Sequence, residues 1–324
     1  MSNHMQTVQV SQPGSAEELR PTRSEKPEPG PGEVLVRTAA IGVNFIDVYY
    51  RNGSYAADYP LVPGQEAAGT VEAVGEGVEG FPPGTRVAYA THLGAYAEFA
   101  VVPADKLVHV PDGVESHDAA AVLLQGLAAH YLTHDTHPIA PGETVVVLAA
   151  AGGLGRLMCQ LAANRGATVI GVVSSELKAK AALEAGAHHT AGYEDFDKEV
   201  RRITDGAGAH VVYDSVGAAT HLQSLRSLRR RGTLAICGLS SGAVPPLDIE
   251  LLRGGGSLFL TRPTMKDHVP DTAALRENAA AVFGYLADGV IRPSIHEALP
   301  LERAADAHRL LESRTTTGKL LLVP

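Results

Sequence analysis

Two patterns of apolar residues alternate through the middle of the chain. Short apolar runs are typical of buried strands, and they predict strands at 144–148, 168–173, 211–214 and 233–237. In the intervals the apolar residues recur every three to four positions, which predicts helices at 154–165, 176–185 and about 220–228. Strands that alternate with helices form parallel sheets with right-handed crossovers. The middle of the chain is therefore predicted to be an α/β domain.

The earlier part of the chain is interrupted by proline. Eleven of the 20 prolines fall by Pro111, and none lies between Pro141 and Pro245. Proline breaks long regular elements, so the first part is predicted to be β-rich, with short strands separated by turns. These strands are expected at 34–40, 67–74, 86–89 and 95–102. Later in the chain, helices are predicted near 272–288 and 304–313, with a last strand at 319–323.

Length and charge narrow the class of protein. A chain of 324 residues is long enough for two domains, and 45% hydrophobic residues can form a sizeable core. The net charge of −9 gives no general electrostatic reason to bind nucleic acid or an anionic membrane, so both are argued against. No apolar run approaches the roughly 18 residues that cross a bilayer. The first twenty residues lack the basic-then-apolar layout of a secretion signal, and a cytoplasmic protein is expected.

The chain has two cysteines, Cys159 and Cys237. Two are too few for a disulfide framework or for a thiolate zinc site. Cys159 falls on the apolar side of a predicted helix and Cys237 at the end of a predicted strand. Both are therefore expected to be inert core thiols.

A glycine-rich turn follows the strand predicted at 144–148. Aligned as Ala150-x-Gly152-x-x-Gly155, it is a Gly-x-Gly-x-x-Gly turn whose first glycine is replaced by alanine. Such a turn brings the backbone close to a pyrophosphate and directs a helix N-terminus at it. A strand before the turn and a helix after it are the context that the motif requires. Gly152, Gly153, Leu154 and Gly155 are the expected cofactor contacts.

The tip of the next strand indicates which dinucleotide binds. NAD-binding versions of this fold place an acidic residue there, whereas this chain continues with Ser174 and Ser175, and Glu176 only follows. Ser174 can hydrogen-bond a phosphate and Lys178 can neutralise one, so the tip favours the 2′-phosphate of NADP(H). The alternative is that Ser175 caps the next helix and Lys178 is a solvated surface charge.

Several segments together carry a family resemblance. They are spread in order over nearly the whole chain: Gly42-Val43-Asn44-Phe45-Ile46-Asp47, Ala149 to Gly155, Val212-Tyr213-Asp214-Ser215-Val216-Gly217, Ser240-Ser241-Gly242-Ala243, Thr261-Arg262-Pro263 and Glu312-Ser313-Arg314. With these segments the chain resembles the NADPH-dependent quinone oxidoreductases of the zeta-crystallin type, within the medium-chain dehydrogenase/reductase superfamily.

The resemblance implies an α/β fold in which a Rossmann parallel-sheet domain is inserted in a GroES-like β-rich domain. The GroES-like catalytic domain would cover 1–125, with 266–324 returning to it, and the Rossmann NADP(H)-binding domain would cover 126–265. It also implies a homodimer joined through the edge of the Rossmann sheet near 257–261.

The same resemblance assigns site residues. Asn44 and Tyr49 are expected near the nicotinamide and Tyr55 in the substrate pocket, and these three are the expected catalytic residues. The expected cofactor contacts beyond Asn44 and the glycine turn are Ser174, Lys178, Tyr193, Ser215, Gly238, Ser240, Pro263 and Arg314. Gln125 stands where the family often has lysine.

The zinc-dependent alcohol dehydrogenases of this superfamily hold their metal with a cysteine after the first long strand and a Gly-His-Glu segment. This chain has Asn44 and Gly64-Gln65-Glu66 at the corresponding places, which supply neither the thiolate nor the imidazole. The resulting hypothesis is zinc-independent reduction of a quinone by NADPH. Two alternatives stay open: an enone or enoyl-thioester reductase of the same superfamily with Tyr49 as proton donor, and a non-catalytic NADPH-binding protein of the crystallin or RNA-binding kind.

Overall fold

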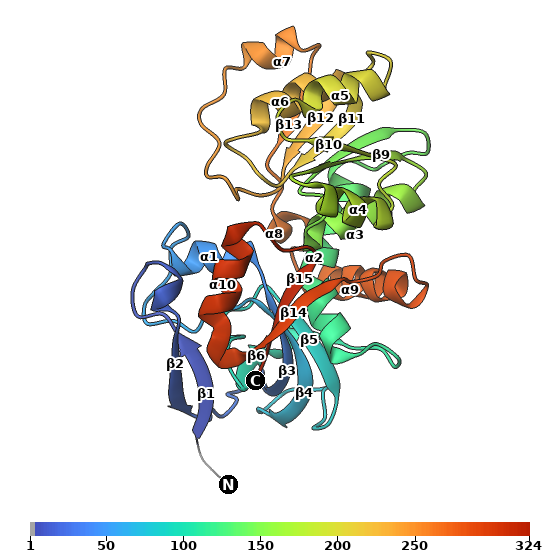
Figure 1. The fold of residues 1–324 in the computed structure, drawn as a ribbon. Helices are drawn as coiled ribbons and strands as arrows, with labels where there is room; N and C mark the ends of the chain where they lie inside the picture. Colours follow the sequence, from blue (N-terminus) through green and yellow to red (C-terminus); the bar gives the residue numbers. More distant parts are fainter. Residues whose placement is uncertain (1–3) are drawn as a thin grey trace. The chain divides into compact units, whose positions relative to one another are not determined.

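The computed structural model describes residues 4–324 and divides the chain into two compact units (Figure 1). Unit 1 contains the chain up to Gln125 together with Asp271–Asp288 and Pro293–Pro324. Unit 2 contains Gly126–Pro270 and Gly289–Arg292. Within 4–324 no helix is long and apolar enough to cross a membrane.

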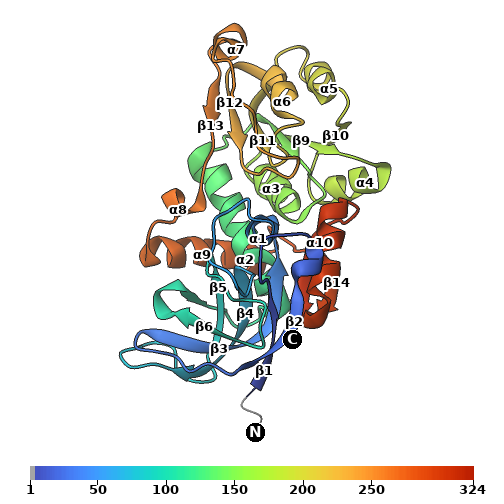
Figure 2. The same cartoon turned by 90° about the vertical axis from the view of Figure 1, so that its left-hand side faces the viewer.

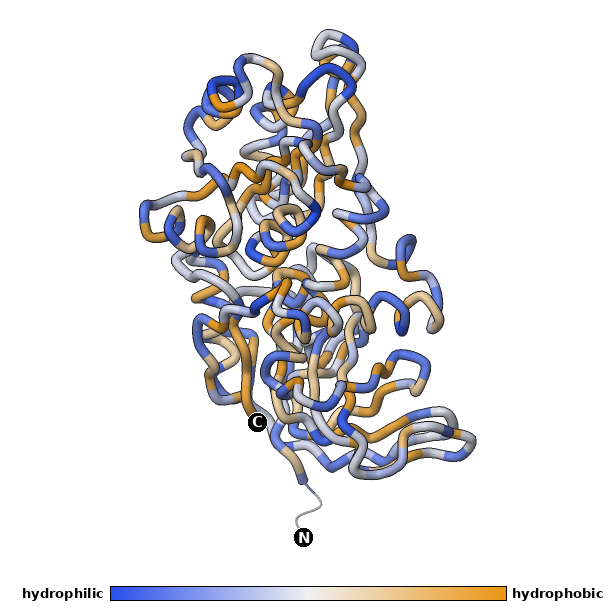
Figure 3. Tube along the Cα trace, turned by 90° about the vertical axis from the view of Figure 1, so that its right-hand side faces the viewer, coloured by the Kyte–Doolittle hydropathy of each residue, from blue (hydrophilic) through white to orange (hydrophobic). Residues whose placement is uncertain are grey.

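Unit 2 is built on a six-stranded parallel sheet in the order β10-β9-β8-β11-β12-β13. This is the doubly wound order of dinucleotide-binding domains, and it confirms the predicted Rossmann sheet. The strands are β8 Thr144–Leu148, β9 Thr168–Val173, β10 His189–Gly192, β11 Ala209–Asp214, β12 Leu228–Ile236 and β13 Phe259–Thr261. Its central strands are apolar because both faces are covered, and Figure 3 shows such apolar stretches alternating with hydrophilic loops.

The helices that follow these strands are amphipathic. Helix α3, Gly153–Asn164, buries the apolar face that its periodicity predicts, and it is followed by Gly166 at φ +81°. Helices α5 and α6 lie side by side (Figure 2). The remaining helices in or entering unit 2 are α2 Ser116–Tyr131 with a π-helical turn at Leu132–Thr136, α4 Glu176–Glu184, α5 Phe196–Ile203, α6 His221–Ser227, α7 Glu250–Gly254 and α8 Met265–His268.

Unit 1 is β-rich. Its main sheet runs β14-β15-β3-β4-β5-β7, with β6 also paired to β3, and β1 and β2 form a separate pair. The strands are β1 His4–Gln9, β2 Arg20–Glu25, β3 Glu33–Val43, β4 Glu66–Val74, β5 Arg86–Ala90, β6 Phe99–Pro103, β7 Leu107–His109, β14 Ile295–Pro300 and β15 Lys319–Val323. Its helices are α1 Phe45–Arg51, α9 Thr272–Ala287 and α10 Ala304–Ser313, with 3-10 turns at Ala16–Glu18, Ala104–Lys106 and Leu301–Arg303.

The last strand determines the layout of unit 1. β15 pairs antiparallel with β3, so that Leu321 lies opposite Gly42 and Leu320 opposite Val43. The two partners are nearly 280 residues apart in the sequence, and their pairing brings Lys319 next to the residues that follow β3.

Two predicted boundaries are wrong. β12 begins at Leu228 rather than 233 and includes Arg229–Arg231. The three arginines lie between Leu228 and Thr233, which pair with Ala209 and Val211 of β11, and the register shifts between these two pairs. The strand expected from 95 begins at Phe99, because residues just before it bond to the β1 segment instead, as in the hydrogen bond from Val8 N–H to Tyr96 O of 2.9 Å. The short elements β10 and α5 were not predicted, although Phe196, Val200 and Ile203 of α5 recur at helical spacing.

Candidate functional site

The glycine turn after β8 has the geometry that the motif requires. Gly152 is the N-cap of α3, so the first N–H groups of the helix have no acceptor within it. A Cβ on Gly155 would lie 2.2 Å from Ala149 O, and only glycine therefore lets the helix pack this closely on the turn. Gly152, Gly153, Leu154 and Gly155 thus open a helix that can receive a phosphate.

Alanine replaces the first glycine of the motif because a neighbouring strand makes room for it. The methyl group of Ala150 is buried, and a Cβ added to Gly171 of β9 would lie 2.8 Å from it. Gly171 on the adjacent strand thus leaves the space that the methyl group of Ala150 occupies.

The tip of β9 carries the residues predicted to select NADP(H). Ser174 is exposed, and Ser175 Oγ accepts a hydrogen bond from Lys178 N–H of 3.4 Å, so Ser175 does cap α4. The residue Lys178 is partly buried, and this burial lowers the pKa of its ammonium group. Lys178 is therefore not the fully solvated charge of the alternative interpretation.

Tyr193 follows β10 and lies against the glycine turn. Its hydroxyl oxygen accepts a hydrogen bond of 3.0 Å from Ala149 N–H, and Ala149 has φ +50°. The contact ties the loop after β10 to the turn after β8. Tyr193 thereby lies beside the predicted phosphate-binding backbone.

Asp214, a residue that the sequence reasoning missed, organises the loop after β11. Its buried carboxylate accepts hydrogen bonds from the N–H groups of Val216 and Gly217 and from the hydroxyls of Thr220 and Ser224, at 2.7–2.9 Å. The available signal was an acidic residue at the end of an apolar strand, followed by Ser215 and, two positions further on, by Gly217.

The loop after β11 is also joined to the loop after β12. Ser240 N–H donates to Ser215 O at 3.4 Å, and a Cβ on Gly238 would lie 2.5 Å from the same oxygen. Pro263 follows β13, where the guanidinium of Arg262 donates to Ile236 O at 3.2 Å. The predicted cofactor contacts of unit 2 therefore all follow carboxyl ends of parallel strands, which is where doubly wound sheets bind nucleotides.

The other predicted residues lie in unit 1. They are Asn44, Tyr49, Tyr55 and Arg314.

Asn44 precedes α1 and is buried. Its side-chain amide donates to Gly42 O at 3.1 Å and to Glu66 Oε2 at 2.9 Å. Its Oδ1 accepts from Lys319 Nζ at 2.7 Å and from Gln125 Nε2 at 3.1 Å. Four hydrogen bonds use the whole capacity of an amide side chain. The direct contact expected between Asn44 and the nicotinamide stays a prediction.

An ion pair lies at the centre of this cluster. Lys319 Nζ is 2.6 Å from Glu66 Oε2, and the two side chains are 2% and 0% exposed. The other carboxylate oxygen, Oε1, accepts from Leu124 N–H at 2.6 Å. Gly42 leaves room for the carboxylate, because a Cβ there would lie 2.2 Å from Glu66 Oε2. Sequence reasoning gave Lys319 no role, although a lysine at the start of an apolar strand was a signal.

The tyrosines form an aromatic group after the start of α1. The rings of Tyr49 and Tyr55 have centroids 5.3 Å apart, and Tyr50 meets Tyr55 edge-on at 5.6 Å. Tyr55 N–H donates to Tyr49 O at 3.0 Å. Tyr49 and Tyr55 are partly exposed, so the structure brings these two predicted site residues together, and their roles stay predictions. Arg314 is the C-cap of α10, at φ +57°.

Cys159 is buried, as expected of a core thiol, whereas Cys237 is partly exposed. Burial raises the pKa of Cys159 and of Cys237 to about 12. Both are thiols at neutral pH, and a thiolate nucleophile is not available at either position.

Comparison with known proteins agrees with this geometry. Residues 30–112 match the family model of the alcohol dehydrogenase GroES-like domain, and residues 153–270 match that of the zinc-binding dehydrogenases. The chain is 44% identical to a quinone oxidoreductase of Pseudomonas aeruginosa, over 98% of this chain and 99% of the relative. It is 43% identical to a 2-haloacrylate reductase of Burkholderia, over 91% and 92% of the two chains.

The similarity extends from the sequence to the three-dimensional fold, as a solved structure shows. Escherichia coli quinone oxidoreductase complexed with NADPH is 40% identical and superposes with a TM-score of 0.96, over 98% of this chain and 100% of the other. The chain belongs to the quinone oxidoreductase family. The family lies within the medium-chain dehydrogenase/reductase superfamily, and the predicted combination of a GroES-like and a Rossmann domain is confirmed.

One of the two matching family models is named for zinc, but the residues of this quinone oxidoreductase family member do not fit the metal. At the positions that correspond to the zinc-binding cysteine and histidine of the superfamily, this chain has Asn44 and Gln65. The ammonium of Lys319 donates to Asn44 and to Glu66, the residue after Gln65. The cluster offers neither a thiolate nor an imidazole. Across 4–324, no three or more histidine, cysteine, aspartate and glutamate side chains are grouped to hold a metal ion.

The buried ion pair of Lys319 and Glu66 leads to a prediction for the stability of the protein. Lys319→Met leaves the Glu66 carboxylate buried without its cation and should lower the free energy of unfolding by about 3–5 kcal/mol. The double variant Lys319→Met/Glu66→Gln should recover most of that loss, because no charge is then left unpaired. Urea denaturation of the three proteins measures both effects.

A matched control is the partly exposed pair of Lys26 and Glu72, whose side chains are 27% and 31% exposed. Lys26→Met should cost at most about 1 kcal/mol. A double variant as unstable as Lys319→Met alone would show that the charge pairing is not what stabilises this cluster.

Asp47 leads to a prediction for how the stability of the protein depends on pH. Burial raises the pKa of its carboxyl group to about 7, against the hydrogen bond from Asn44 N–H and the charge of Lys319, which lower it. Between a pH near the ordinary carboxyl pKa of 3.8 and a pH of about 7, the unfolded chain has lost this proton while the folded chain keeps it. The contribution of Asp47 to stability is therefore present at low pH and lost as the pH rises, by at most about 1.4 kcal/mol per pH unit.

Asp47→Asn removes this proton but can still accept from Asn44 N–H. The difference in unfolding free energy between wild type and variant, measured in urea from pH 4 to 8, should fall as the pH rises to about 7 and then level off. A difference that is flat over this range would contradict the raised pKa.

Proposed function

We propose that this protein catalyses the NADPH-dependent, zinc-independent reduction of quinones. The observation that carries the proposal is the identity of 40–44% to bacterial quinone oxidoreductases over 98% of the chain. We assign the catalytic role to 1–125 with 266–324 and cofactor binding to 126–265.

Cofactor binding is supported by the carboxyl edge of the sheet in unit 2. The N-terminus of α3 would bind the pyrophosphate, and Ser174 and Lys178 would bind the 2′-phosphate that distinguishes NADPH from NADH. Tyr193 would lie at the adenine side, next to the turn that it contacts through Ala149. When bound, NADPH supplies the hydride, and the protein supplies binding and orientation.

The acceptor would be bound by Tyr49 and Tyr55, whose rings present flat apolar faces and polar hydroxyls. Reduction of a quinone needs no general acid from the protein, because it gives an aromatic product whose oxygens can take protons from water. The hydroxyl of Tyr49 could hydrogen-bond the acceptor oxygen as negative charge develops on it.

A second candidate is the reduction of an activated carbon–carbon double bond. It is favoured by one observation, the 43% identity to a 2-haloacrylate reductase. This reaction needs a proton at carbon, for which Tyr49 is the candidate donor.

One set of assays tests both candidates. NADPH oxidation is followed with 1,4-benzoquinone, 9,10-phenanthrenequinone, 2-chloroacrylate and an α,β-unsaturated ketone, with NADH as the control cofactor. Quinone turnover that prefers NADPH by about tenfold or more is expected, because Lys178 compensates the charge of the 2′-phosphate. Turnover of the acrylate or enone alone would establish the second candidate, and NADPH binding without turnover would leave a non-catalytic binding protein.

We also propose a homodimer formed through β13. This strand is the edge of the sheet in unit 2, and its Phe259 and Leu260 are 55% and 43% exposed. An exposed apolar edge strand is a template for pairing with another chain, and a second copy would cover it symmetrically. Exposed Ile249 and Leu251, at the start of α7 in the same part of the chain, extend the apolar surface. The cytoplasmic location expected from the sequence stays a prediction.

The dimer is tested by charge at the edge strand. Leu260→Lys should convert the protein to a monomer, because two lysines would be buried opposite each other. Sedimentation equilibrium of the variant and of the wild type measures this. Leu183→Lys on α4, where the leucine is 48% exposed, is the control and should keep the wild-type mass. A monomeric wild type, or a dimeric Leu260→Lys variant, would contradict the interface.

A further inference from the structure

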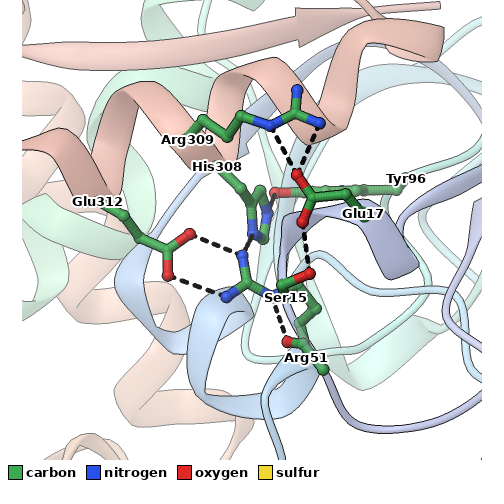
Figure 4. Close-up of polar contacts among 8 residues, drawn as sticks. Ser15, Glu17, Arg51, Tyr96, His308, Arg309 and Glu312 are labelled. Carbon is green, nitrogen blue, oxygen red and sulfur yellow. Dashed lines mark hydrogen bonds and ion pairs between the residues drawn. The ribbon is translucent and has the colours of Figure 1, made fainter.

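A chain of polar side chains joins α1 to α10 inside unit 1 (Figure 4). It runs from Arg51 at the end of α1 to His308 of α10, then to Tyr96, and from Tyr96 to Asp47 in the first turn of α1. All four side chains are buried, at 2% exposure or less. None of them has a part in the reaction as proposed above.

The direction of each hydrogen bond in this chain follows from the chemistry of arginine. A guanidinium can only donate, so His308 Nδ1, 3.2 Å from Arg51 Nη1, is the acceptor. The proton of a neutral imidazole must then lie on Nε2, which donates to the Tyr96 hydroxyl oxygen at 2.9 Å. The hydroxyl proton of Tyr96 in turn donates to Asp47 Oδ2 at 3.3 Å. One tautomer of His308 fits this arrangement.

His308 is held in its neutral form. Burial, together with the nearby charge of Arg51, lowers the pKa of the imidazole to about 3. The imidazole of His308 therefore stays neutral throughout the range in which the protein is expected to work.

Arg51 is fixed by three further hydrogen bonds. Its Nε donates to Gly14 O at 3.1 Å, and its two terminal nitrogens donate to the Glu312 carboxylate at 2.8 and 2.9 Å. This bidentate geometry sets the orientation of the guanidinium as well as its position. Glu312 is 38% exposed, so the pair reaches from the interior to the surface.

The hydrogen-bonded side chains fix both ends of α1, a helix that would not be stable alone. α1 has seven residues, which is too short for a helix to be stable alone. Asp47 fixes its first turn and Arg51 its last residue, while Tyr49 lies between them and Tyr55 bonds to the Tyr49 carbonyl. Displacement of either end of α1 would move both tyrosines.

We propose that Arg51 and His308 are positioning residues for the acceptor-binding tyrosines, acting through α1. The inference rests on the proposed function, in which Tyr49 and Tyr55 bind the acceptor. A buried charge and a buried imidazole are costly to keep, and a fixed geometry of α1 is what they provide.

Three variants test the proposal. His308→Leu removes both hydrogen bonds of the imidazole, whereas His308→Gln keeps one acceptor and one donor. Arg51→Lys keeps the charge but loses the bidentate geometry. We expect kcat/KM for the quinone to fall by about tenfold or more in His308→Leu and Arg51→Lys, with a rise in the quinone KM. His308→Gln should retain most of the activity.

The control readouts separate positioning from general destabilisation. The Kd for NADPH, measured by its fluorescence, should stay within about twofold of wild type in all variants, because the proposed cofactor residues of unit 2 are untouched. Arg309→Lys on the exposed side of α10, where Arg309 pairs with Glu17 and Asp306, should have wild-type kinetics. Wild-type quinone kinetics in both His308→Leu and Arg51→Lys, or equal losses of quinone turnover and NADPH affinity, would overturn the proposal.

A spectroscopic readout keeps the test separate from the proposed function. The imidazole ¹⁵N shifts of His308 at pH 6 should show a neutral ring protonated at Nε2. An imidazolium, or a proton at Nδ1, would overturn the hydrogen-bond chain whatever the enzyme reduces. A wild-type protein that shows the expected shifts but reduces no quinone would refute the proposed function, and with it the positioning of an acceptor site.

Discussion

The arrangement of unit 1 depends on one buried ion pair, between Lys319 at the start of the last strand and Glu66 at the start of β4. The pair can form only if β15 lies beside β3, and only if Gly42 leaves space for the carboxylate. Through Asn44 and Leu124 the same two charges reach the start of α1 and the helix α2. The free energy of removing two charges from water is recovered only because every one of these partners is in place.

The family shows how a chain can keep a fold and change the chemistry at its centre. Beside Asn44, which stands where zinc-dependent members of the superfamily have a cysteine, this chain holds an ammonium group that is part of the protein. An ammonium group cannot polarise a substrate as a Lewis acid does, but it needs no supply of metal and can hold Asn44 in one orientation. This fits an acceptor such as a quinone, which is electron-poor enough to take a hydride without a metal.

The sequence predicts well what depends on neighbouring residues. The bounds of β8 and β9 follow from apolar runs, and the start of α3 follows from the glycine turn, because periodicity and turn chemistry are local. It predicts poorly what depends on a distant partner. Arg229–Arg231 lie within β12 between the two segments that pair with β11, and His308 is a conspicuous residue only once Arg51 and Tyr96 lie against it. The Lys319–Glu66 pair joins residues 253 positions apart, a separation that no local pattern records.

The alanine in the glycine turn has a consequence for how such sequences can change. Ala150 and Gly171 share one small space, which holds a single methyl group. A lineage could move the methyl group from the turn to the strand only by losing it at 150 first, since gaining it at 171 first would force two carbons to 2.8 Å. The order of the two mutations is therefore constrained. Two glycine patterns that look different in sequence can thus describe the same cofactor turn, connected by a path that is open in one order only.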